Sequence, residues 1–95
     1  MIVSMLQCII EIPESSSIKD KRRIVHSLRE KLRRTFNISA AEVDLADSLG
    51  FAHIGGALVS NSREFGEKVL QKAVLMIEKE VPGCLQDVQI HSESF

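Results

Sequence analysis

The chain has 95 residues, of which 44% are hydrophobic and 26% are charged, and its formal net charge is −1. This length and composition predict one domain over residues 1–95, with a single hydrophobic core. No apolar run approaches the roughly 18 to 20 residues that a bilayer-spanning helix needs, and the first residues lack a signal-peptide pattern. We therefore expect a cytoplasmic protein without a membrane partner.

The first part of the chain predicts a strand followed by a long helix. Residues 1–12 are β-compatible and carry apolar side chains at both parities, which is typical of a central strand that ends at Pro13. A serine-rich loop then leads to Ser17, whose hydroxyl suits a helix N-cap. The helix is expected to reach about Thr35, because apolar residues recur at three- and four-residue spacing. Its buried stripe consists of Val25, Leu28 and Leu32.

The second part predicts two strands, a helix and a last strand. Residues 37–44 and 51–60 have strand length and are joined by a polar segment, which favours a hairpin. Asn61 predicts the start of a helix that runs to Glu80, and residues 85–92 alternate as a strand does. The order β-α-β-β-α-β predicts an α+β, ferredoxin-like fold, in which two helices cover one face of a four-stranded antiparallel sheet.

The other face of this sheet has no predicted cover. Pairing Asp44 with Phe51 in the hairpin would place Glu42 opposite His53. This face carries more apolar side chains than a sheet face in contact with water needs. We therefore expect it to pack against a second copy of the chain in a homodimer. In this register Ala41 and Val43 point toward the helices, whereas Val3, Met5, Ile9, Ile38, Ala40, Ala57 and Val59 lie on the open face.

The predicted first helix is strongly basic. Residues 19–34 contain eight basic and two acidic side chains, so this segment carries +6 while the rest of the chain carries −7. This asymmetry indicates an anionic partner, and phosphate contact favours RNA or a ribonucleoprotein. A solvated helix face is the alternative, and it would be favoured if the guanidinium groups were paired with the protein's own carboxylates. The candidate nucleic-acid-binding residues are Lys19, Lys21, Arg22, Arg23, Arg29, Lys31, Arg33 and Arg34.

Other reactive side chains suggest weaker hypotheses. Glu42 opposite His53 predicts a cross-strand ion pair, or alternatively a small-ligand site in a homodimeric regulatory module. The three histidines and two cysteines lack the spacing of metal ligands, so we expect neither a metal nor a cofactor. We expect no enzymatic activity, although burial of Lys21 beside Glu42 or Asp44 would be a reason to reconsider. Gly55 and its neighbour Gly56 lie inside a strand and indicate a bulge or a close backbone approach.

Four segments of the chain resemble the YlxP-like family of small bacterial proteins: residues 1–3, 17–23, 36–44 and 59–61. The resemblance implies a ferredoxin-like domain without an assigned biochemical role. Such proteins are often encoded beside translation initiation and ribosome-binding factors, which implies an association with RNA or the ribosome. Members often carry a tryptophan and an arginine in the hairpin loop, where this chain has Leu49 and Phe51.

Overall fold

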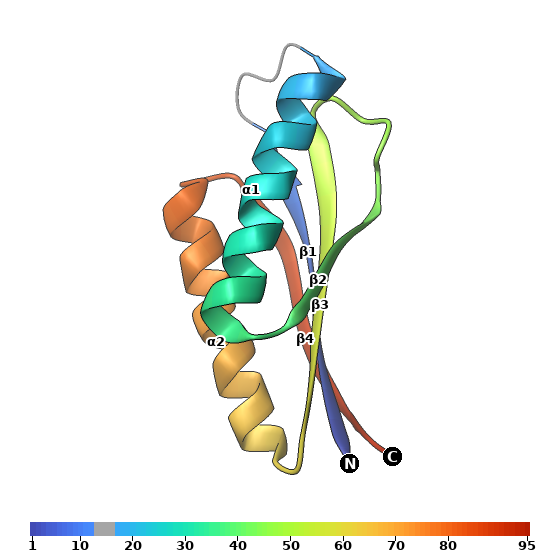
Figure 1. Ribbon diagram of the computed structural model, residues 1–95, viewed down its shortest axis with the longest axis vertical. Coiled ribbons are helices and arrows are strands. Elements are labelled where there is room, and N and C mark those ends of the chain that lie inside the picture. Colours follow the sequence, from blue (N-terminus) through green and yellow to red (C-terminus); the bar gives the residue numbers. More distant parts are fainter. Residues whose placement is uncertain (13–16) are drawn as a thin grey trace.

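The computed structural model describes residues 1–12 and 17–95. The four strands form one antiparallel sheet in the order β2-β3-β1-β4, and both helices cover the same face of it (Figure 1). The predicted ferredoxin-like fold is therefore confirmed. The predicted end of the first strand at Pro13 and the serine-rich loop lie outside the described residues. The elements are β1 (Ile2–Glu11), α1 (Ile18–Phe36), β2 (Ser39–Asp44), β3 (Phe51–Ser60), α2 (Arg63–Glu80) and β4 (Leu85–Ser94).

Local side-chain chemistry sets the ends of α1. Ser17 is the N-cap, as predicted, and its Oγ accepts a hydrogen bond of 3.1 Å from the backbone N–H of Asp20. At the other end Asn37 adopts the left-handed conformation, with φ of 53°, which stops the helix. The next strand therefore begins at Ser39 and not at Asn37 as predicted.

The second helix begins one residue later than predicted. Its N-cap is Ser62 and not Asn61, and the Ser62 Oγ accepts a hydrogen bond of 3.1 Å from the backbone N–H of Phe65. The last strand also runs two residues beyond the predicted end, to Ser94. Neither α1 nor α2 contains a stretch that is long and apolar enough to cross a membrane.

The hydrophobic core lies between the helices and the sheet. The predicted stripe of α1 is confirmed, because Val25, Leu28 and Leu32 are each at most 5% exposed. The helix-facing side chains of the central strands and of α2 complete this core. These residues include Leu6, Cys8 and Ile10 in β1, Ala52 and Ile54 in β3, and Leu70, Ala73 and Ile77 in α2.

The predicted hairpin register is wrong by two residues at Asp44, which pairs with His53 in place of Phe51, and by one residue at Glu42, which pairs with Ile54 in place of His53. Between these two pairs, β2 has one more residue than β3. Val43 is the extra residue of this bulge and is 54% exposed, although it was predicted to face the helices. Ala40 is buried against the helices, where an exposed position was predicted. The same correction places Ile38 in the core and Ala41 on the open face.

The basic residues are confined to one layer of the fold, the helices. All twelve Lys and Arg residues of the chain lie in the helices, eight in α1 and four in α2. The four described strands contain none of them. The sheet therefore offers no lysine or arginine to an anion, and any phosphate contact by these residues must come from the helical layer.

The buried thiol of Cys8 makes the stability of the protein sensitive to high pH. Desolvation by burial raises the pKa of Cys8 from 9.0 to about 11. Between these two values the unfolded chain loses the thiol proton and the folded chain keeps it, so the free energy of unfolding should fall by up to about 1.4 kcal/mol per pH unit. Urea titrations from pH 8 to 11 should show this loss, and Cys8→Ala should reduce it. Equal slopes in both proteins would contradict the prediction.

Candidate nucleic-acid interface

Tertiary contacts divide the eight predicted basic residues into two groups. Three of them form ion pairs with carboxylates of the same chain, and the other five do not pair with any carboxylate among residues 1–12 and 17–95. The three pairs are Lys21 Nζ to Glu42 Oε2 at 3.1 Å, Lys31 Nζ to Glu80 Oε2 at 2.7 Å, and Arg33 Nη1 to Glu30 Oε1 at 3.2 Å.

Lys21 is the main surprise of α1, because its side chain is only 1% exposed. Its ammonium group donates a hydrogen bond to the carbonyl oxygen of Leu45 and lies beside the Glu42 carboxylate. The approach to Glu42 Oε2 is that of an ion pair without hydrogen-bond geometry, since this buried oxygen accepts no hydrogen bond from the described residues. Lys21 thus connects α1 to β2 and to the loop that follows β2. Because it is buried, its side chain is not available to a partner at the surface.

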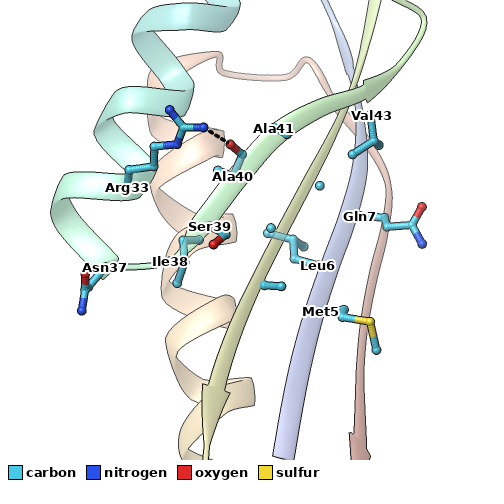
Figure 2. A pocket seen from close by; sticks show the side chains of 13 residues that line it. Met5, Leu6, Gln7, Arg33, Asn37, Ile38, Ser39, Ala40, Ala41 and Val43 are labelled. Carbon is cyan, nitrogen blue, oxygen red and sulfur yellow. Dashed lines mark hydrogen bonds between the residues drawn. The ribbon is translucent and has the colours of Figure 1, made fainter.

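Lys31 and Arg33 are exposed but connect α1 to its neighbours. Lys31 reaches Glu80 at the end of α2. Arg33 contacts Glu30 one turn earlier in α1, and its Nη2 donates a hydrogen bond of 2.8 Å to the carbonyl oxygen of Ala40 in β2 (Figure 2). These two side chains stabilise the packing of α1 and have fewer donors left for a partner.

The remaining five basic side chains form what we call the cationic face of α1. Four of them are exposed, whereas Arg29 is half-buried and lies with Nη2 at 3.2 Å from Nδ1 of His26. Because a guanidinium can only donate, His26 accepts this hydrogen bond through Nδ1. Arg29 Nε is buried and has no hydrogen-bond partner among the described residues. The cationic face comprises Lys19, Arg22, Arg23, Arg29 and Arg34.

A groove between α1 and β2 borders the cationic face. It has a volume of about 500 Å³ and is lined by four residues of that face. His26 and Val25 complete its helical wall, and Glu42 stands on the strand side. The negative charge of Glu42 is offset by the adjacent ammonium group of Lys21. The groove is therefore a partly enclosed surface whose guanidinium groups are able to donate hydrogen bonds to phosphate oxygens.

The structure does not bring Glu42 and His53 together, so the predicted cross-strand pair is wrong. Glu42 lies opposite the buried Ile54 and therefore on the helical side of the sheet, where its carboxylate contacts Lys21. His53 lies on the open face instead, where its Nε2 is 3.0 Å from Oε1 of Gln7. Glu42 and His53 therefore do not share a binding site.

Sequence reasoning missed a second hollow, which lies at the β2 edge of the sheet and is lined both by open-face residues and by Arg33 and Asn37 at the end of α1. It has a volume of about 710 Å³, and Figure 2 shows Met5, Gln7 and Val43 on its open-face side. The glycine pair in β3 was its signal, since Gly55 leaves room for a neighbouring side chain. A Cβ added at Gly55 would lie 2.9 Å from Cγ1 of Val43, so at this glycine the close neighbour is the side chain of the bulged residue of β2. A Cβ added at Gly56 would lie 3.5 Å from the carbonyl oxygen of Ser39, which is the backbone approach that the sequence suggested.

Comparisons with solved structures support the fold alone. The chain resembles the de novo designed protein Foldit4 with a TM-score of 0.51 and 13% identity, over 99% of this chain and 97% of that one. It also resembles the protein At3g17210 from Arabidopsis thaliana with a TM-score of 0.54 and 12% identity, over 98% of this chain and 94% of that one. Both cover nearly the whole arrangement of strands and helices.

Sequence comparisons are more specific. The chain is 29% identical over 76 residues to the uncharacterized protein YlxP of Bacillus subtilis (strain 168), which covers 80% of this chain and 83% of that protein. Residues 3–90 match the family described as a protein of unknown function, DUF503, and this match extends from β1 into β4. The chain therefore belongs to the DUF503 family, which agrees with the resemblance seen in its sequence.

Proposed function

We propose that this is a non-enzymatic cytoplasmic protein that binds RNA, alone or within a ribonucleoprotein, through the cationic face of α1. One observation supports the proposal above others. Four exposed basic side chains and the half-buried Arg29 lie on one helix without a carboxylate partner among the described residues. The alternative of a solvated helix face predicted instead that the guanidinium groups would pair with carboxylates of the same chain.

The layout of charge favours contact with the RNA backbone over recognition of bases. The cationic face extends from Lys19 to Arg34, which corresponds to about 22 Å along a helix with a rise of about 1.5 Å per residue. That length allows contact with several phosphate groups. The sheet has no lysine or arginine, and the chain has no Trp or Tyr on which bases could stack in the manner of an RRM. We therefore propose recognition of phosphate groups and RNA shape.

The buried pair of Lys21 and Glu42 is the feature that would favour an enzymatic alternative. The Lys21 ammonium group is directed at the Leu45 carbonyl and at Glu42, and Lys21 lines neither of the grooves described above. A catalytic lysine must reach its substrate. We therefore assign this pair a structural role. The small-ligand alternative also loses support, because Glu42 and His53 lie on opposite faces of the sheet.

The dependence of RNA affinity on salt tests the proposal. For single-stranded RNA, four to five phosphate contacts should give a slope of about −3 to −3.5 for log K against log salt concentration. Affinity for a labelled oligonucleotide should therefore fall roughly 60- to 130-fold between about 50 and 200 mM KCl. Purified ribosomal subunits and a folded RNA hairpin are the parallel probes. Binding that does not change with salt, or no binding to any of the three probes at about 50 mM KCl, would overturn the proposal.

A further inference from the structure

We propose that the open face of the sheet is an interface between two copies of this chain. Three strands of ten residues and β2 of six residues form this face. At about 3.3 Å per residue and about 4.8 Å between strands, it measures roughly 33 by 19 Å, or on the order of 600 Å². A standard stable interface buries about 800 Å² of accessible surface on each partner. One sheet face therefore provides an area close to that requirement.

The side chains of this face are suited to burial. Val43 and Val59 are 54% and 64% exposed, and Phe51 is 40% exposed at the end of β3. The strands contribute no lysine or arginine, so pairing two such faces brings no basic side chain of the sheet into contact with its own copy. Apolar residues at the open-face positions of the strands are Val3, Met5, Ile9, Val43, Phe51, Ala57 and Val59.

Two pairs of polar side chains on the face already have hydrogen-bond partners. His53 Nε2 lies 3.0 Å from Gln7 Oε1, across the two central strands. His91 Nε2 lies 2.6 Å from Glu93 Oε1 within β4. Burial costs less free energy for polar groups that keep a hydrogen bond than for groups that lose one. The open face could therefore exclude water without leaving these histidines unpaired.

The shape of the open face also favours contact with a second copy of itself. Part of the hollow at the β2 edge opens onto this face beside Gly55 in β3, whereas Val59 projects from the same strand four residues later. A two-fold axis makes every contact reciprocal, so the projection on each copy can enter the hollow on the other. This reciprocity favours a second copy over a small ligand, which would fill the hollow and leave Val59 exposed.

Sedimentation velocity of the full chain at about 10 µM tests this interface. We expect a dimer for the wild type and a monomer for Met5→Lys with Val59→Lys, with dimerisation at least about 100-fold weaker because two unpaired ammonium groups would be buried on each copy. Leu75→Lys is the matched control, since Leu75 is 70% exposed on α2 and should leave the dimer intact. Val59→Lys alone is a second variant, to be used if the double variant fails to fold by circular dichroism.

Three outcomes would overturn the inference: a monomeric wild type, folded sheet variants that still dimerise, or a control that dissociates equally. Native mass spectrometry of the same samples shows the occupant directly. A monomer that carries a small molecule would assign the hollow to a ligand and would also overturn the dimer. No RNA is present in these measurements, so their result does not depend on the proposed function of α1.

Discussion

Reversal of three charges on the cationic face, by Arg22→Glu, Arg23→Glu and Arg34→Glu together, is expected to weaken RNA binding by at least about 100-fold at about 100 mM salt. Each substitution would remove a proposed phosphate contact and add a charge that repels the RNA backbone. All three positions are exposed and lack a carboxylate partner among the described residues, so the protein should remain folded. Fluorescence anisotropy with the labelled oligonucleotide measures the loss.

The control for this prediction changes the net charge by the same amount on the other helix. Lys68→Glu, Lys72→Glu and Lys79→Glu alter three exposed residues of α2 and should reduce affinity by less than about tenfold, through long-range electrostatics alone. If both triple variants lose affinity equally, net charge and not the face of α1 decides binding. If the α1 variant binds as the wild type does, the cationic face plays no part.

Replacement of the buried lysine, by Lys21→Met, is expected to lower the free energy of unfolding by about 3 to 5 kcal/mol. The methionine would leave the Glu42 carboxylate beside the core without a counter-charge and the Leu45 carbonyl without its donor. The Glu42 side chain is 18% exposed, so partial hydration favours the lower end of this range. Urea denaturation followed by circular dichroism gives the value.

Two further variants make this stability prediction specific. Lys19→Met changes an exposed lysine two residues away and should alter stability by no more than about 0.5 kcal/mol. Lys21→Met combined with Glu42→Leu removes both charges and should recover part of the loss. RNA affinity should be preserved in Lys21→Met wherever the protein stays folded. A stable Lys21→Met protein would contradict the structural role that we assign to this pair.

The fold was predictable because its determinants are local. The apolar spacing of Val25, Leu28 and Leu32 defined the buried stripe of α1, and Ser17 marked the start of that helix. The order of strands and helices then left few simple topologies. The register of the hairpin was not predictable, since the bulge at Val43 shifts the pairing by one residue, and a shift of one exchanges the two faces of β2.

The charge of the candidate site was visible in the sequence, but its distribution was not. Lys31 reaches Glu80, which lies 49 residues further along the chain, and Lys21 reaches Glu42 in the neighbouring strand. Both pairs depend on how α1 is rotated and placed, which spacing alone cannot specify. Three of the eight predicted basic residues therefore pair with carboxylates of the same chain. The five residues of the cationic face remain available to a partner.

Both helices lie on the same side of the sheet, and this asymmetry has a consequence for how a pair of subunits would engage a polyanion (Figure 1). If two sheets associate back to back, the two copies of α1 point outward in opposite directions. Such an assembly would be bivalent, with its binding surfaces too divergent for one short oligonucleotide to occupy both. Long or folded RNA could engage the two surfaces at once and gain avidity, so the pair would act as a bridge between distant segments.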